Sequence, residues 1–170
     1  MDPFIFPVPP APRTAVLVPW FRNPWSIPLL TRQPIRVFRE GWGVEAARYE
    51  AAAIAGTVEQ LRALMPWRIP SLTHAVIALA RPRGKRLSEG DRDRLWRAFQ
   101  VPVFEQIIGK SGELLAFECE AHDGLHVESS NLPLKGEALC TALCPCGRKT
   151  PRIGVTEGTE SERRLAAYAR

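Results

Sequence analysis

Apolar and polar positions in the middle of the chain follow two different periods. Residues 74–80, HAVIALA, form a short continuous apolar run of the kind that buried strands have. Residues 88–99 follow with helical spacing that places Leu95, Trp96 and Phe99 on a narrow apolar face, and Ser88 stands where a helix N-cap is expected. VPVFEQII, residues 101–108, then repeats the strand pattern. Strand, helix and strand within residues 74–108 predict a βαβ unit, hence an α/β fold with a partly parallel sheet.

The flanking segments extend this picture. Residues 44–65 are rich in alanine and have helical spacing, and we expect two consecutive helices, interrupted at Gly56 and restarted at the N-cap Thr57. Beyond residue 108, alternating apolar positions closed by turns predict a series of shorter strands. These strands are expected over residues 113–120, 124–128 and 136–143.

Proline sets the first part of the chain apart. Residues 1–36 carry many of the 16 prolines. Because proline fixes φ and removes a backbone donor, this segment is predicted to be an extended arm, with TAVLV (14–18) as its strand candidate. The predicted organisation is an arm over residues 1–36, an α/β domain over 37–153 and a C-terminal tail over 154–170.

Composition and charge narrow the function classes. The chain has 23 basic and 18 acidic residues, and its one dense basic run, RPRGKR (81–86), has no aromatic residues interleaved with it. A solvated turn explains that run better than a nucleic-acid contact does. The N-terminus lacks the basic start and continuous apolar core of a signal peptide, and no stretch has the length of a membrane span. We therefore expect a cytoplasmic protein without a membrane partner.

Cysteine and histidine are concentrated in one short region. All four cysteines and two of the three histidines lie within residues 119–146. Zinc requires four ligands at the corners of a tetrahedron, usually delivered as close pairs from two loops. The candidate pairs are Cys119 with His126 and Cys144 with Cys146, and Cys140 and His122 are spares that could replace a member.

Two other interpretations of this region stay open at this point. Cys119 and Cys140 can be inward-facing strand residues that act as small hydrophobic side chains, with His122 and His126 as ordinary turn histidines. Reactive redox thiols are the third interpretation. In a reducing compartment, clustered cysteines favour metal or reactive thiols over disulfides.

The same motifs resemble a known family. Glu118–Cys119, Gly124–His126 and Cys144–Arg148 match the Glu-Cys, Gly-x-His and Cys-x-Cys-Gly-Arg segments of the phenylacetate-CoA ligase and coenzyme F390 synthetase-like group of adenylate-forming enzymes. The resemblance covers about residues 70–153 and makes the α/β domain a partial ligase-like domain. It implies a zinc set, and four protein ligands would leave no open position, which is typical of a structural site. The implied ligands are Cys119, His126, Cys144 and Cys146.

Departures from the family pattern are equally informative. No phosphate loop rich in Ser, Thr and Gly is present, and Phe104 stands where a P-loop reading of IIGKSGE (107–113) needs glycine. That segment also departs from the family's aromatic-Gly-x-Ser/Thr-Glu motif, because one residue is inserted and the aromatic residue is lost. We expect the segment with the ribose-binding Arg-Asp pair and the small C-terminal domain with its lysine to be absent. These departures argue against ATP, AMP and CoA as cofactors.

The expected function follows from both the matches and the departures. The leading hypothesis is a shortened, divergent adenylate-forming protein with a structural zinc site, not a competent ligase alone. It would act as a ligand-binding or accessory protein for an aromatic or acyl small molecule or for a larger ligase subunit. An active acyl-adenylate or acyl-CoA ligase completed by a partner subunit is the alternative, so enzymatic activity stays open. A small zinc-dependent nucleic-acid-binding module ranks third.

Overall fold

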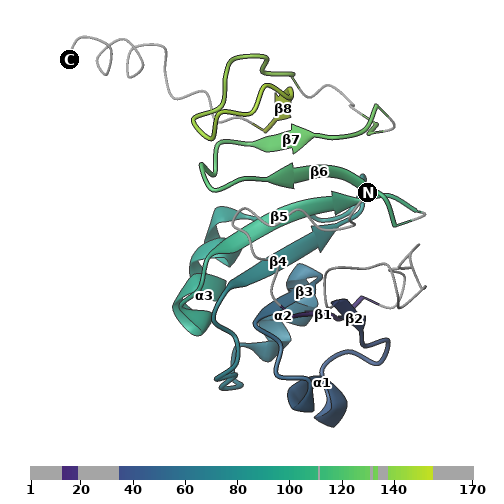
Figure 1. The fold of residues 1–170 in the computed structure, drawn as a ribbon, viewed down its shortest axis with the longest axis vertical. Coiled ribbons are helices and arrows are strands. Elements are labelled where there is room, and N and C mark those ends of the chain that lie inside the picture. The colour runs from purple at the N-terminus through teal and green to yellow at the C-terminus, as the bar shows by residue number, and fades with distance from the viewer. Residues whose placement is uncertain (1–12, 19–34, 111, 131, 134–137, 155–170) are drawn as a thin grey trace, which may run out of the picture.

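A computed structural model describes residues 13–18, 35–110, 112–130, 132–133 and 138–154 of the chain. Within that part, the chain forms eight strands in one sheet and three helices (Figure 1). The strands are β1 (Thr14–Val16), β2 (Ile35–Val37), β3 (Ala53–Gly56), β4 (Ala75–Ala80), β5 (Val103–Ile108), β6 (Leu114–Glu118), β7 (Leu125–Val127) and β8 (Arg152–Ile153). The helices are α1 (Val44–Arg48), α2 (Val58–Leu64) and α3 (Glu89–Phe99).

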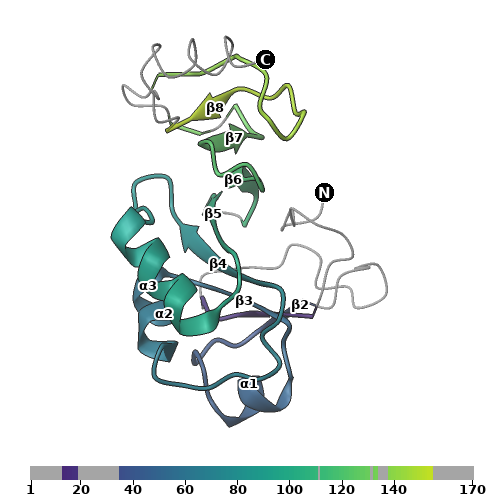
Figure 2. The same ribbon diagram turned by 90° about the vertical axis from the view of Figure 1, so that its left-hand side faces the viewer.

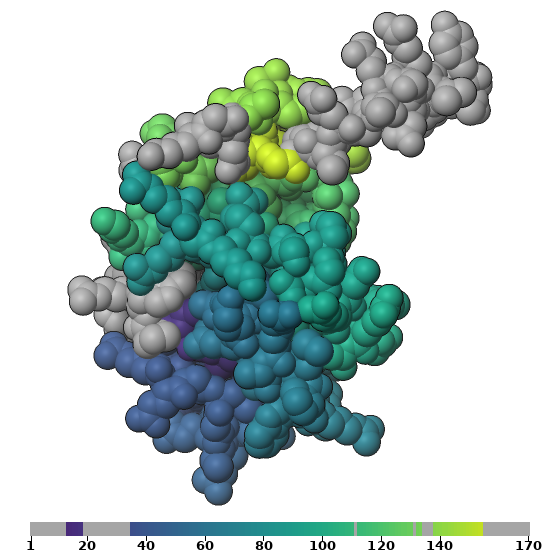
Figure 3. Space-filling model, turned by 180° about the vertical axis from the view of Figure 1, so that it is seen from behind, coloured from purple at the N-terminus to yellow at the C-terminus, as the bar shows by residue number. Residues whose placement is uncertain are grey.

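The sheet has a parallel half and an antiparallel half. Its strand order is β2-β1-β3-β4-β5-β6-β7-β8, and β1 to β5 pair in parallel while β6, β7 and β8 are added antiparallel. From β3 to β8 the strands follow one another in chain order along the sheet, as the colour change from blue to yellow in the space-filling view shows (Figure 3). The predicted βαβ unit is confirmed as β4–α3–β5, with Val76 in register with Val103. The α/β fold and partly parallel sheet are confirmed with it.

Side chains alternate between two cores across the parallel strands. In β4, Val76 and Ala78 point to the face covered by α2 and α3 (Figure 2), whereas Ile77 and Leu79 belong to a second cluster on the opposite face. All six residues of β4 are buried. Strands buried on both faces are continuously apolar, which is why HAVIALA identified this strand without an alternating pattern. The second cluster also contains Cys119 and Cys144, so the cysteine-rich region adjoins a core.

Helix α3 begins where the sequence predicts. The Ser88 hydroxyl accepts a hydrogen bond from the Asp91 backbone N–H and donates one to the Asp91 carboxylate at 2.9 Å. Leu95 is completely buried, but Trp96, which the same spacing placed on the apolar face, is 52% exposed. The buried stripe of α3 is narrower than the spacing suggests.

The prediction of two consecutive helices over 44–65 is wrong in part. Helix α1 ends at Arg48, and residues 53–56 form β3, which pairs with β1 and β4. Ala53, Ile54 and Ala55 are fully buried in that central strand. Helix propensity is worth less than about 1 kcal/mol per residue, and burial together with hydrogen bonding on both sides of the strand outweighs it.

The remaining strand expectations have different outcomes, and those over 113–120 and 124–128 are confirmed as β6 and β7. TAVLV contains β1, which lies inside the sheet between β2 and β3 although proline-rich sequence surrounds it. The strand expected over 136–143 is wrong for its described residues 138–143, where a single bridge between Cys140 and Arg152 forms. Most of the predicted arm and nearly all of the tail lie outside the described residues.

We expect Thr57→Ala to destabilise the protein by about 1 kcal/mol. Thr57 and Gln60 form a reciprocal capping box at the start of α2, with hydrogen bonds of 3.3 and 2.9 Å. The Gln60 amide also donates to the Leu17 carbonyl at 2.7 Å, so the cap joins α2 to the end of β1. Urea unfolding measures the effect, with the exposed Thr73→Ala as the matched control. Equal stabilities of the two variants would contradict the role of the cap.

Candidate metal centre

The antiparallel half of the sheet brings the cysteine-rich region together. Cys119 directly follows β6, and His126 is the middle residue of β7, which pairs with β6. Cys144 and Cys146 come from a tight turn before β8, in which the Gly147 N–H donates to the Cys144 carbonyl at 2.8 Å. Gly147 has φ +84°, a left-handed conformation that glycine adopts without strain. The turn therefore directs two nearby thiols toward the strand pair.

Four side chains converge on one point. The ligand atoms of Cys119, His126, Cys144 and Cys146 all lie within 4.8 Å of one another. The sulfurs of Cys119 and Cys144 are 3.7 Å apart, and the Cys146 sulfur lies 3.4 Å from His126 Nε2. A tetrahedral zinc ion with Zn–S bonds of about 2.3 Å and Zn–N bonds of about 2.0 Å requires S···S edges of about 3.8 Å and S···N edges of about 3.6 Å. This Cys₃His cluster can therefore hold a metal ion.

The surroundings of His126 orient it as a ligand. His126 Nδ1 lies 2.7 Å from the Thr150 hydroxyl, and with Nδ1 as the donor the other ring nitrogen, Nε2, faces the sulfurs with its lone pair. The His126 ring stacks on the Phe117 ring at 5.4 Å between centroids, and the Arg148 guanidinium lies over the Phe117 ring, 5.1 Å from its centroid. Burial and the nearby Arg148 charge lower the pKa of His126, which keeps the imidazole neutral and able to bind metal.

Two of the thiols have opposite electrostatic environments. Burial raises the pKa of Cys119 to about 12, so this thiol holds its proton until a cation compensates the thiolate. Burial also acts to raise the pKa of Cys146, but the backbone hydrogen bond from Arg148 and the neighbouring thiols of Cys144 and Cys119 shift it downward. A bound cation would favour the thiolate form of both, and metal binding would therefore release protons.

The spare residues lie outside this cluster. Cys140 pairs with Arg152 through the backbone and accepts a weak contact from its guanidinium at 3.7 Å. His122 has φ +50° and stacks on Phe104 at 5.0 Å, and its Nδ1 lies 2.8 Å from Glu118. Both are committed to other contacts. The structure thus brings together the same four residues that the family resemblance implied, and it contains no second cluster of this type among the described residues.

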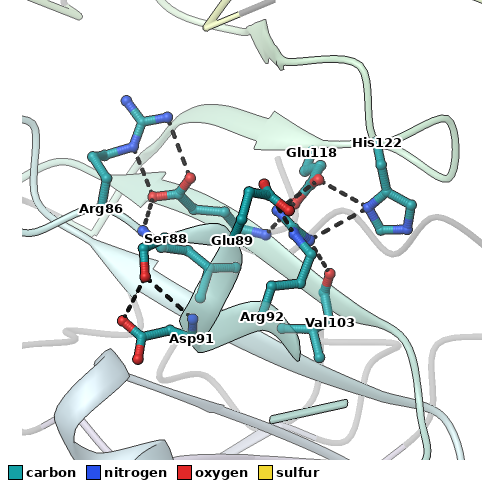
Figure 4. A network of polar contacts seen from close by, with 10 residues as sticks. Arg86, Ser88, Glu89, Asp91, Arg92, Val103, Glu118 and His122 are labelled. Atoms are coloured by element: carbon teal, nitrogen blue, oxygen red, sulfur yellow. Dashed lines mark hydrogen bonds and ion pairs between the residues drawn. The ribbon is translucent and has the colours of Figure 1, made fainter. Parts of the chain in front are cut away.

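A buried ionic network, which no local sequence pattern identifies, joins α3 to the neighbouring strands (Figure 4). Glu118 is 4% exposed and contacts the Arg92 guanidinium of α3 at 3.0 Å. The same carboxylate accepts the Glu105 backbone N–H at 2.8 Å, and Arg92 donates to the Val103 carbonyl at 2.6 Å. These contacts join α3 to β5 and β6. Because Arg92 and Glu118 are 26 residues apart in the sequence, no local pattern indicates that they form a pair.

A pocket of about 420 Å³ opens at the carboxyl ends of β4 and β5. Arg81 directly follows β4, Gly109 and Lys110 directly follow β5, and Arg83 completes its basic lining. Open α/β sheets bind ligands at this edge, outside the carboxyl ends of their parallel strands. A Cβ atom at Gly109 would lie 2.2 Å from the Glu113 carboxylate, so the present position of that carboxylate depends on glycine here. The full lining is Arg81, Pro82, Arg83, Gly109, Lys110, Glu113, Leu115 and Pro133.

Comparison with solved structures finds a similar fold in a CoA ligase. The chain is similar to 2-hydroxyisobutyryl-CoA ligase, solved in an open conformation in complex with 2-HIB-AMP and CoA, with a TM-score of 0.60 and 14% identity. The match covers 86% of this chain and 44% of that ligase, so the chain spans less than half of its length. The same ligase in the postadenylation state, in complex with R3-HIB-AMP, matches with a TM-score of 0.47 and 14% identity over 72% of this chain and 37% of that one.

The described part of the chain therefore has an α/β fold similar to that of 2-hydroxyisobutyryl-CoA ligase, and it contains a Cys₃His cluster able to hold a metal ion. No family model matches the sequence, and no curated protein matches it significantly. The narrower resemblance to phenylacetate-CoA ligases stays a prediction. None of the described helices has the length and apolar character needed to cross a membrane.

Proposed function

We propose that this chain is a zinc-stabilised domain that binds an anionic acyl or acyl-adenylate ligand in the carboxyl-edge pocket, and that it acts as a ligand-binding or accessory protein of ligase type. The observation that carries the proposal is the pocket itself, where Arg81, Arg83 and Lys110 converge at the ends of two neighbouring parallel strands. Three cations beside a single carboxylate, Glu113, favour an anion.

Zinc has a structural role in this proposal. Three thiols and one imidazole are the donor set that structural zinc sites use, and four protein ligands leave no position for a reacting water. Cys119 and Cys144 also belong to the core cluster on the second face of the sheet, so the ion would fasten the β6–β7 pair and the turn before β8 to that core. In this proposal the metal site holds segments of the chain together, and the ligand binds in the separate carboxyl-edge pocket.

The fold of the similar ligase supports the ligand class. That enzyme holds 2-HIB-AMP and CoA, both of which carry phosphate. This chain covers 44% of that ligase, so a complete ligase reaction would need further parts. The competing proposal is that a partner supplies them. In it, the same pocket would serve an acyl-adenylating enzyme completed by a partner subunit. Release of pyrophosphate from ATP in the presence of a carboxylic acid would favour the competing proposal.

Calorimetric titration with AMP and, separately, CoA tests the ligand pocket. We expect Arg83→Gln or Lys110→Gln to weaken binding about tenfold, because each removes a charge-assisted contact to the anion. Lys85→Gln is the matched control, since Lys85 lies in the same basic run but pairs with Glu59 at 3.4 Å and does not line the pocket. Absence of binding at millimolar concentrations of both ligands, or an equal loss in the control, would contradict the proposal.

A further inference from the structure

A second basic hollow lies at the opposite, amino-terminal edge of the parallel strands. It has a volume of about 280 Å³ and is lined by Arg13, Arg36, Glu45, Arg48 and Tyr49. Because β1, β2 and β3 run parallel, residues at their beginnings meet at one edge of the sheet. This edge is the opposite one from the edge that carries the carboxyl-edge pocket, and the two linings share no residue.

Main-chain contacts fix the three arginines of this hollow. The Arg13 carbonyl accepts the N–H groups of Ala52 and Ala53 at 2.9 and 3.0 Å, which holds Arg13 at the junction of β1 and β3. Arg36 is in register with Ala15 of β1. Arg48 lies in the last turn of α1. Three separate segments thus present guanidinium groups to one small volume.

Aromatic rings support two of these guanidinium groups. Arg13 lies over the Tyr49 ring at 5.9 Å, and Arg36 lies over the Phe38 ring at 5.1 Å. Phe38 and Tyr49 pack against each other at 5.6 Å between centroids. A guanidinium stacked on a ring keeps its in-plane N–H donors directed outward, and this fork matches phosphate oxygens in pairs.

Local acids leave the hollow able to accept an anion. Glu50 lies 3.9 Å from Arg13 and Glu45 lies 3.5 Å from Arg36, and the two carboxylates are 71% and 81% exposed. Exposed ion pairs of this kind contribute little, so a multivalent anion can displace them. Burial raises the pKa of Tyr49, and the nearby positive charges of Arg13 and Arg36 oppose that shift.

We propose that this amino-edge hollow binds a phosphate-bearing small molecule, with Arg13, Arg36 and Arg48 as its ligands. The site is independent of the carboxyl-edge pocket and of the ligand proposed for it. Its volume suits one phosphate or diphosphate group with little else enclosed, so the remainder of such a ligand would extend into solvent.

Calorimetric titration of the full chain with sodium pyrophosphate at constant ionic strength tests this site. We expect Arg13→Gln and Arg48→Gln to weaken binding tenfold or more, because each removes a charge-assisted contact to phosphate. Arg48→Lys keeps the charge but loses the planar fork, and we expect an intermediate loss. Thermal unfolding of each variant verifies that it is folded.

Two further variants separate this site from general electrostatics and from the other pocket. Arg97 is an exposed arginine of α3 outside the hollow, and Arg97→Gln should leave pyrophosphate affinity unchanged. Lys110→Gln should leave the pyrophosphate affinity of the amino-edge hollow unchanged, although that variant weakens anion binding in the carboxyl-edge pocket. No pyrophosphate binding at millimolar concentration, an equal loss in Arg97→Gln, or a loss confined to Lys110→Gln would overturn the proposal.

Discussion

Wild-type protein purified without a histidine tag is expected to contain about one zinc ion per chain, and Cys144→Ser is expected to contain almost none. The physical reason is that one missing thiolate opens the tetrahedron, and a serine hydroxyl is a poor replacement for a deprotonated sulfur. Elemental analysis of the two proteins after gel filtration measures the metal content directly.

Stability is expected to follow the metal. A site filled by free metal at a thousand times Kd stabilises the folded state by about 4 kcal/mol, and a loss of that size lowers Tm by roughly 10 °C in a domain of this length. A chelator should therefore lower the Tm of the wild type, and it should leave the Tm of Cys144→Ser unchanged because no ion remains to be removed. Differential scanning calorimetry with and without chelator makes the comparison.

Cys140→Ser is the matched control for the metal experiment. Cys140 lies in the same region but outside the cluster, and it is half-buried against Arg152. Its serine variant should keep both the metal and the response to chelator. If the wild type contains no metal and its Tm does not change with chelator, Cys119 and Cys144 are core side chains and not metal ligands. If Cys140→Ser loses the metal and Cys144→Ser keeps it, Cys140 is a ligand in place of one of the proposed four.

Arg92→Ala is expected to destabilise the protein by about 3 kcal/mol, which is the second largest effect that the structure predicts. Arg92 is the cation that faces the buried Glu118 carboxylate, at 3.0 Å, and the Arg92 side chain is itself only 20% exposed. Without it, Glu118 keeps the Glu105 N–H and His122 but loses its main counter-charge. Urea unfolding at neutral pH measures the change.

A double-mutant cycle separates charge from packing in this network. Glu118→Gln can still accept the Glu105 N–H but carries no charge, so Arg92→Ala should cost markedly less in that background. Glu89→Ala is the matched surface control, because Glu89 contacts Arg92 at 3.6 Å but is 86% exposed. Its effect should stay within about 0.5 kcal/mol. Equal costs of Arg92→Ala in both backgrounds would show that lost packing, and not the buried charge, explains the effect.

Short stretches of sequence were sufficient to predict the elements whose pattern lies within a few neighbouring residues. The continuous apolar run of β4, the N-cap Ser88 of α3 and the following run of β5 each depend on neighbouring side chains, and together they predicted the βαβ unit. The spacing of the cysteines and histidines likewise identified a candidate metal site. Residue types and short distances along the chain were sufficient for these conclusions.

Tertiary structure alone decided which contacts form between distant segments. Residues 53–56 have helical composition, yet they form a central strand because β1 and β4 hydrogen-bond to them from both sides. The choice of Cys119 and Cys144, and not Cys140, for the cluster depends on how the turn before β8 folds back onto β7. The Arg92–Glu118 pair and the arginines at the amino edge join segments far apart in sequence. Packing between such segments leaves no periodic trace in the sequence, because it depends on the sheet order and on the register of each strand with its neighbours.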